Sequence, residues 1–180
     1  MTSNLHYEGE LAIAIGRDQP LLPRMSANEA DGNVPGAISS TEDAMSIVFG
    51  YAIACDLTRR DLQKQSKEKG QPWDTSKSFE ESCPVSAIVS LADTQISPNS
   101  KLTTHVDAEC RQQTLLSDMT WSVPEIIMHL SMYFRLRAGD LILTGTPAGV
   151  GPLHIGNTVR IRVTEDEKDI LPPCEFEICD

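Results

Sequence analysis

Residues 6–15, HYEGELAIAI, combine two acidic side chains with an apolar stretch that is unbroken from residue 11 to residue 15. Alternation that gives way to a continuous apolar run is typical of a strand entering a buried sheet. Residues two apart in a strand point to the same face, so Glu8 and Glu10 share a face with His6. We therefore expect two carboxylates, a few ångströms apart, at the mouth of a buried strand.

Two carboxylates held together near a core repel each other unless one is protonated or a cation bridges them. Asp56 supplies a third acid, because it follows the apolar run FGYAIAC (49–55) directly before an expected helix. Sites are common where a strand ends and a helix begins. Three acids without Cys or His at ligand spacing favour Mg²⁺ or Mn²⁺ over zinc. The alternative is a solvated strand face with Asp56 in a turn.

Other polar residues offer fewer signals. Arg60 and Gln63 share a face of the expected helix, as residues of an ordinary solvated helix also do. Lys77 lies between aromatic residues and could be partly desolvated, although a surface lysine is the ordinary interpretation. The stretch GTPAGVG (145–151) lacks the Gly-Lys-Ser/Thr ending of a phosphate loop. Its N–H groups and the Thr146 hydroxyl suit an organic carboxylate instead.

Composition limits the classes of partner. The 180 residues carry 15 basic and 26 acidic side chains, a net charge of −11, which would repel nucleic acid and anionic membranes. Hydrophobic residues make up 40% and charged residues 23%, as in an ordinary globular domain. The longest apolar runs are far shorter than the ~20 residues that span a bilayer, and the start shows no secretory signal. We expect one domain over residues 1–180, located in the cytoplasm or, in a eukaryote, the mitochondrial matrix.

Cysteines and most histidines are not expected to act in chemistry. Five cysteines form an odd set without a CxxC pair, which favours reduced thiols over disulfides or a zinc knuckle. Structural or surface roles are expected for the histidines without a partner at catalytic spacing, which are His105, His129 and His154.

Periodicity and capping signals predict more strands than helices. Beyond residues 6–15, strands are expected at 49–55, 83–91, 101–106, 141–144 and 159–163. Capping residues predict three helices: one from Ser40 and Asp43 to about residue 48, one from Thr58 and Asp61 to the stop at 70–72, and one from Ser122 and Glu125 to near Arg135. Residues 17–40 are expected to form a loop or an insertion.

Four stretches together resemble the fumarylacetoacetate hydrolase family, in particular its small acylpyruvate hydrolase and oxaloacetate decarboxylase-like members. They are HYEGELAIAIG (6–16), GYAIACDLTRRDLQ (50–63), GQPWDTSKSFEESCPVS (70–86) and LRAGDLILTGTPAGVGP (136–152). Their order and intervals match across residues 6–163. The resemblance implies an α+β, mainly β fold, a mixed β-sandwich roll with flanking helices, and a homodimer.

The resemblance also implies a site. Mg²⁺ or Mn²⁺ would be held by Glu8, Glu10 and Asp56, and a small 2-oxo acid would lie among the residues matching Arg60, Gln63, Lys77 and Thr146. Lys77 would be catalytic, placing positive charge near a developing oxyanion or relaying a proton, and the other three would bind substrate. The implied reaction cleaves a C–C bond of a 2-oxo acid, by acylpyruvate hydrolysis or oxaloacetate decarboxylation, with enolate stabilisation by the cation.

Two alternatives stay open: an isomerase or tautomerase on the same cation site, and a catalytically silent protein that binds metal and dicarboxylate. Family members carry a lid segment with a His/Glu pair that activates water, upstream of the first strand. Only five residues precede His6 here, so we expect this base to be missing from the chain as given, through truncation, a lid from another chain, or loss of hydrolysis. Without it hydrolysis would slow by ~10² to 10⁴, whereas decarboxylation and tautomerisation need no nucleophilic water.

Overall fold

The computed structural model describes residues 2–19 and 37–179. Most of the loop or insertion predicted at 17–40 therefore lies outside the described residues. The strands are β1 (Leu5–Tyr7), β2 (Gly9–Ile15), β3 (Val48–Cys55), β4 (Thr58–Arg59), β5 (Val89–Ser90), β6 (Lys101–Val106), β7 (Glu109–Leu115), β8 (Leu141–Leu143), β9 (Gly151–Leu153), β10 (Thr158–Glu165), β11 (Lys168–Asp169) and β12 (Cys174–Glu177). The helices are α1 (Thr41–Ser46), α2 (Arg60–Glu68), α3 (Asp74–Lys77), the 3₁₀ turn η1 (Leu116–Asp118) and α4 (Val123–Ser131).

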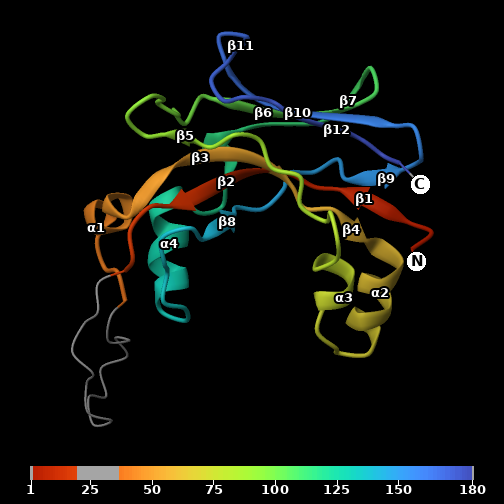
Figure 1. The fold of residues 1–180 in the computed structure, drawn as a ribbon, viewed down its shortest axis with the longest axis horizontal. Helices are drawn as coiled ribbons and strands as arrows, with labels where there is room; N and C mark the ends of the chain where they lie inside the picture. The colour runs from red at the N-terminus through yellow and green to blue at the C-terminus, as the bar shows by residue number, and fades with distance from the viewer. Residues whose placement is uncertain (1, 20–36, 180) are drawn as a thin grey trace.

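The strands form three antiparallel sheets with the orders β4-β1-β9, β5-β3-β2-β8 and β11-β10-β6-β7, the last with β12 also paired to β10. Figure 1 shows the β6–β10 sheet stacked over the curved β2–β3 sheet, with α1 and α4 below one end and α2 and α3 below the other. This mainly β sandwich with flanking helices is the fold class that the sequence predicted.

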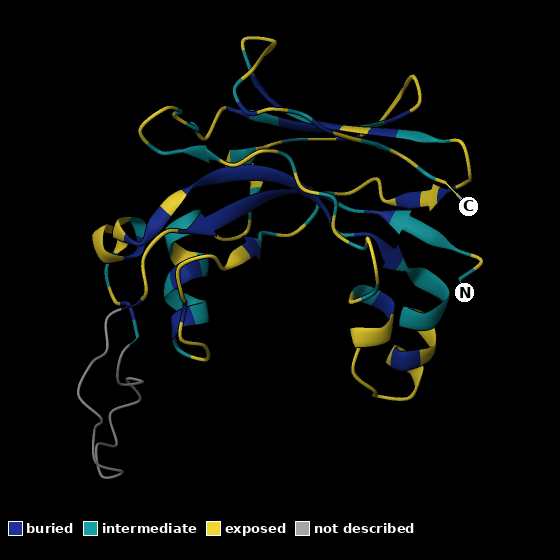
Figure 2. Ribbon diagram, viewed as in Figure 1, coloured by how far each residue is buried: buried dark blue, intermediate teal, exposed yellow. Residues whose placement is uncertain are grey.

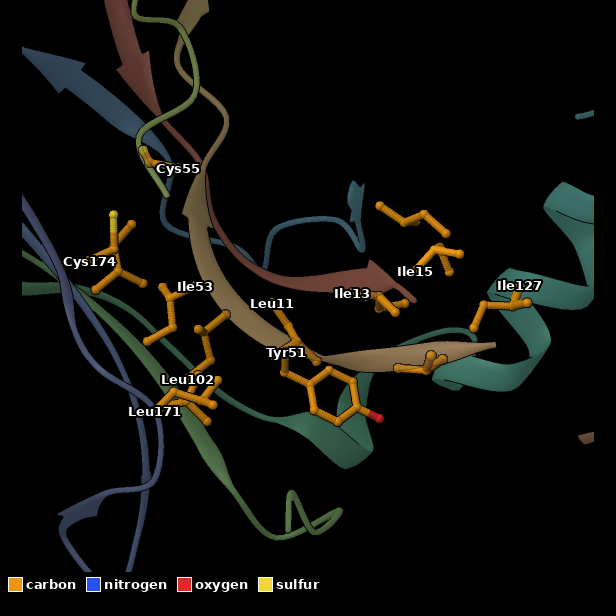
Figure 3. Packing of buried hydrophobic residues seen from close by; sticks show 14 of the residues in the cluster. Leu11, Ile13, Ile15, Tyr51, Ile53, Cys55, Leu102, Ile127, Leu171 and Cys174 are labelled. Carbon is orange, nitrogen blue, oxygen red and sulfur yellow. The ribbon is translucent and has the colours of Figure 1, made fainter. Parts of the chain in front are cut away.

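The core lies between the two larger sheets. Leu11 and Ile13 of β2 and Ile53 of β3 are fully buried together with side chains of β6 and β10. Figure 3 shows Ile53 beside Leu102 and Leu171, and Ile13 further along toward Ile15. Figure 2 shows that β2 and almost all of β3 are buried along their length. The face that points away from the core is buried as well, as its residues Ala12, Ala52 and Ala54 show. Burial on both faces explains the continuous apolar run that marks a central strand.

We expected residues 6–15 to form one strand, but they form two. The chain leaves the small sheet after Tyr7 and enters the four-stranded sheet at Gly9, so Glu8 lies at the crossing between β1 and β2. The two halves pair with different partners, β4 and β9 for β1, β3 and β8 for β2. A periodicity argument sees side-chain alternation but not a change of pairing partner.

The predicted helix after residue 58 exists, but its capping box does not. Thr58 and Arg59 form β4 instead, and α2 begins at Arg60 without a side-chain cap. The carboxylate of Asp61 accepts hydrogen bonds from Thr2 and Ser3, so it is used in a tertiary contact rather than in a cap.

The strand predicted at 83–91 is also wrong in most of its length. Within it the structure has only the two-residue β5 and one bridge between Val85 and Ala54. Pro84 has no N–H to donate to a ladder, and its carbonyl accepts a hydrogen bond from Cys55 at the end of β3. The segment therefore follows the β3 edge through isolated hydrogen bonds.

The remaining predicted elements hold within a few residues. The helix caps at Ser40 and Ser122 are present, as are strands at 101–106 and near 141–144 and 159–163. Helix α4 ends at Ser131, before the predicted end near Arg135. Strands β7, β9 and β12 were not predicted, and β7 is too polar to show an alternating pattern.

Candidate metal centre

Strand register brings three acids to one place. In the β2–β3 pair, Gly9 lies opposite Cys55, and one residue further out the backbone N–H of Asp56 donates to the Glu8 carbonyl at 2.9 Å. Residues opposite each other in an antiparallel pair share a face, and Glu10, two residues along, shares it with Glu8. The three carboxylates, of Glu8, Glu10 and Asp56, each offer one oxygen within 4.8 Å of the others.

The acids occupy the face of β2 and β3 that lies opposite the large aliphatic side chains. Further along this face the side chains are small: Ala12, Ala52 and Ala54 are fully buried and form a cluster of their own. The strand pair therefore places the branched aliphatic residues toward the core and the acids and alanines away from it. This division explains why the sequence is apolar on both faces of these strands: one face carries large aliphatic residues and the other carries alanines.

Two helices bring cationic side chains to the acids. The start of α2 is fixed by a hydrogen bond from the Arg60 N–H to the Asn4 carbonyl. Arg60 Nη2 donates to Glu8 Oε1 at 2.7 Å, and its Nη1 donates to Gln63 Oε1 at 2.6 Å. Lys77, at the end of α3, donates from Nζ to Glu8 Oε2 at 2.8 Å and to Asp56 Oδ2 at 2.5 Å.

Charge and burial favour a cation at this cluster. Three carboxylates face two cationic side chains, which leaves one negative charge in excess when all three acids are ionised. Glu10 is the most buried of the three, and burial raises the pKa of its carboxyl to about 7, although a hydrogen bond from the Gly145 N–H opposes the shift. For Lys77, burial alone would lower the pKa, but hydrogen bonds to Asp56 and Glu8 outweigh it and raise the pKa. Clustered carboxylate oxygens with uncompensated charge are a donor set that fits Mg²⁺ or Mn²⁺.

Of the predicted substrate residues, Arg60 contacts Glu8 and Gln63 contacts Arg60, whereas the Thr146 hydroxyl is used within the protein. Thr146 Oγ1 donates to the Gly9 carbonyl at 2.9 Å and accepts from Gln112 Nε2 at 2.8 Å. Its role toward a substrate stays a prediction. The group of this loop that reaches an acid is instead the backbone N–H of Gly145, which donates to Glu10 Oε2.

Sequence reasoning missed Gln112, and it assigned the N–H groups of 145–151 to an organic carboxylate, whereas the Gly145 N–H donates to the side chain of Glu10. Gln112 is a buried amide in β7, a strand whose other residues are mostly exposed. No periodic signal separates it from Gln113, its neighbour in the sequence, because both are polar and lie in a polar strand. Only the packing of β7 against the acid-bearing strand identifies it.

The structure bears on the predictions for the cysteines and for one of the histidines. All five cysteines are free thiols. The His129 ring packs against Trp121 and Tyr133, with ring centroids 4.4 Å and 5.2 Å apart, as expected of a structural histidine. Among the described residues, no helix is both long enough and apolar enough to span a membrane.

Comparison with known proteins places this geometry in a family. The model of the fumarylacetoacetate (FAA) hydrolase C-terminal family matches residues 1–175. The chain belongs to the fumarylacetoacetate hydrolase family. It is 38% identical over 162 residues to a fumarylpyruvate hydrolase of a Ralstonia species, covering 90% of this chain and 75% of that relative. It is 43% identical over 159 residues to the mitochondrial oxaloacetate tautomerase FAHD1 of Bos taurus, covering 88% of this chain and 64% of that relative.

A solved relative shares the fold closely. The fumarylpyruvate hydrolase from Pseudomonas aeruginosa, crystallised in complex with Mn²⁺ and pyruvate, is 32% identical and superposes with a TM-score of 0.83. The match covers 99% of this chain and 67% of that one. The chain thus spans about two thirds to three quarters of the length of these relatives.

Removing one carboxylate tests the cation site. In the Asp56→Ala variant, Mn²⁺ and Mg²⁺ are expected to lose the stabilisation that they give the parent, which for a ligand at 100 times its Kd is about 2.7 kcal/mol. Thermal unfolding with chelator and with metal measures the shift. Glu68→Ala, which removes an exposed acid of α2, is the control and keeps the full shift. An Asp56→Ala protein that metal stabilises as much as the parent contradicts the ligand assignment.

Proton competition at Glu10 predicts pH-dependent metal binding. Because burial raises the pKa of Glu10 to about 7, Mn²⁺ affinity is expected to level off above that pH and to weaken up to about tenfold for each pH unit below it. Isothermal titration calorimetry across this range measures the slope, and an affinity independent of pH contradicts it.

The metal-free protein has the opposite pH dependence. A carboxyl whose folded-state pKa lies above its ordinary value of 4.5 favours the folded state when protonated. The contribution of Glu10 to stability in chelator therefore grows as the pH falls from about 7 towards 4.5 and is lost as the pH rises again. Denaturant unfolding in chelator measures this, and Glu10→Gln, which cannot ionise, should flatten the dependence.

Proposed function

We propose that this chain catalyses a divalent-cation-dependent cleavage of a C–C bond in small 2-oxo acids, by oxaloacetate decarboxylation or acylpyruvate hydrolysis. The observation that carries the proposal is the cluster of three carboxylate oxygens within 4.8 Å of one another, flanked by Arg60 and Lys77. Such a site is suited to hold a dication and an anionic substrate together. The Pseudomonas aeruginosa relative, described as a complex with Mn²⁺ and pyruvate, supports it.

Each residue has a proposed role. Glu8, Glu10 and Asp56 hold Mg²⁺ or Mn²⁺, which when bound supplies Lewis-acid polarisation of a 2-oxo group. Arg60 pairs with a substrate carboxylate, because a guanidinium binds carboxylates through two parallel hydrogen bonds. Gln63 accepts from Arg60 Nη1 and so fixes the direction of the guanidinium.

Lys77 is the proposed catalytic residue. Its ammonium group lies 2.8 Å from Glu8 Oε2, inside the acid cluster, and so holds a proton and a positive charge where the carbonyl oxygen of a 2-oxo acid gains negative charge. In oxaloacetate decarboxylation the bond between C3 and C4 breaks and CO₂ leaves. The electron pair of that bond stays on the other fragment, the enolate of pyruvate. This enolate then takes a proton at C3.

Keto–enol tautomerisation is the second candidate. The relative that is 43% identical is named an oxaloacetate tautomerase. This reaction moves one proton between C3 and the 2-oxo oxygen and breaks no C–C bond. Lys77, whose pKa is raised, would donate a proton to one of these atoms and regain one from the other. A homodimer and a location in the cytoplasm or mitochondrial matrix remain proposals that rest on the family resemblance alone.

Steady-state assays separate the candidates. The chain is incubated with oxaloacetate and with acetylpyruvate, in Mn²⁺ and in chelator, while pyruvate and the enol absorbance are followed together. Metal-dependent release of pyruvate supports C–C cleavage, and faster enol equilibration without pyruvate supports tautomerisation. Binding of Mn²⁺ without either change overturns both and identifies a silent binder.

Lys77→Met is expected to separate catalysis from metal binding. Loss of a positioned proton carrier should lower turnover by ~10² to 10⁴. Mn²⁺ affinity should be equal or higher, because the ammonium group competes for oxygens of Glu8 and Asp56. The control is Lys67→Met, which removes an exposed ammonium group of α2. A Lys77→Met protein with unchanged turnover, or with weaker Mn²⁺ binding, contradicts the role.

A further inference from the structure

A buried amide joins the two backbone segments that carry the groups of the site. Gln112 of β7 is only 1% exposed. Its Oε1 accepts from the Gly9 N–H at 3.1 Å, and its Nε2 donates to Thr146 Oγ1 at 2.8 Å and to the Pro147 carbonyl at 2.9 Å. Both amide hydrogens and the carbonyl oxygen are therefore used, although Gln112 contacts none of the acids in these hydrogen bonds.

Both segments that Gln112 holds lead directly to the acids. Gly9 is the residue between Glu8 and Glu10, so fixing its peptide fixes the origin of both side chains. Gly145, the neighbour of Thr146, donates its N–H to Glu10 Oε2. The Thr146 hydroxyl also donates to the Gly9 carbonyl at 2.9 Å. Gln112, Gly9 and Thr146 thus form a closed ring of hydrogen bonds.

The packing around this ring leaves little freedom. A Cβ on Gly9 would lie 2.1 Å from the buried Thr104 Oγ1 and 3.3 Å from Gln112 Oε1. A Cβ on Gly149 would lie 2.1 Å from the Arg111 carbonyl. Glycines allow β6 and β7 to press directly on the acid-bearing strand and on the 144–149 loop. A side chain of β7 can therefore set the position of both backbones.

We propose that Gln112 is a positioning residue for the cation site, which holds the Glu8–Gly9–Glu10 backbone and the Gly145 N–H at the spacing that three-carboxylate coordination needs. The proposal rests on the proposed function for the identity of the site. It adds a residue on a different sheet, outside the acid cluster and its cationic neighbours. Small errors of ligand placement are costly because the supporting residues fix the geometry of a metal site.

The test compares Gln112→Met with the matched control Gln113→Met in the full chain. Methionine keeps the length of the side chain and removes its hydrogen bonds. Mn²⁺ is titrated without substrate, well below the melting temperature, by calorimetry or by the electron paramagnetic resonance signal of free Mn²⁺. Loss of a supporting residue of a metal site weakens affinity by about 10- to 100-fold, and Gln113→Met is expected to bind as the parent does.

A merely structural role gives a different result. Gln112→Met would then melt at a lower temperature in chelator while binding Mn²⁺ with the parent Kd at low temperature. That result overturns the proposal.

Thr146→Val provides a second variant that is close in shape and lies in a partly exposed position. It removes the hydroxyl that links Gln112 to Gly9, so it too should weaken Mn²⁺ binding by about tenfold or more. Since both changes break one ring, the double variant should lose less than the sum of the two single losses in binding free energy. Parent-like Mn²⁺ affinity in Thr146→Val overturns the proposal even where Gln112→Met fails to fold.

These readouts are independent of turnover. If the parent binds Mn²⁺ and leaves every 2-oxo acid unchanged, the proposed function fails while the role of Gln112 is still decided by the Kd values. If the parent is active and Gln112→Met binds Mn²⁺ as tightly as the parent, only the inference about Gln112 fails.

Discussion

Repulsion among three carboxylates is the constraint around which the site is built. The β2–β3 register places Glu8 opposite Asp56 and puts Glu10 on the same face, so carboxylate oxygens of the three residues lie within 4.8 Å of one another. Like charges at this spacing, partly removed from water, destabilise the fold unless they are protonated, paired or bridged by a cation. The neighbouring helices and the 144–149 loop contribute the groups that offset this repulsion.

The groups that offset the repulsion among the carboxylates are of two kinds, side-chain cations and a backbone N–H donor. Lys77 and Arg60 are long, flexible cations, and both contact Glu8 at distances of 2.7–2.8 Å. The Gly145 N–H is a fixed backbone donor, and it reaches the most buried acid, Glu10. A flexible cation can rearrange when a dication or a substrate binds, whereas the Gly145 N–H belongs to a loop that Gln112 holds through hydrogen bonds to Thr146 and Pro147. The site therefore combines a rigid inner side with an adaptable outer side.

Glycine and alanine make this arrangement possible on the strand pair. Large side chains occupy only one face of β2 and β3, and the second face carries alanines beyond the acids. At Gly9 the absence of a Cβ lets Thr104 and Gln112 of the other sheet approach the backbone between two of the acids. The stacking of the sheets thus supports the site directly as well as forming the core.

Much of the fold and of the acid cluster could be predicted from local pattern. Glu8 and Glu10 are two residues apart, a spacing that predicts one shared face, and the hydrogen bond from the Asp56 N–H to the Glu8 carbonyl extends the β2–β3 pairing as far as Glu8. The helix cap at Ser40 and the capping box at Ser122 depend on neighbours within three residues, and both are present. The Thr58 cap failed because Asp61 finds Thr2 and Ser3, partners more than fifty residues away that no local rule contains.

The sequence by itself determined the fold class, the family and the pair of acids in the first strands, because these follow from short-range spacing and from motifs in a fixed order. Only the tertiary structure decided that residues 6–15 form two strands in different sheets, with Glu8 between them. It also decided that Lys77 reaches both Glu8 and Asp56 and that Gln112 lies behind Gly9. The physical reason is that these contacts depend on strand register and sheet stacking, which join residues far apart in the chain.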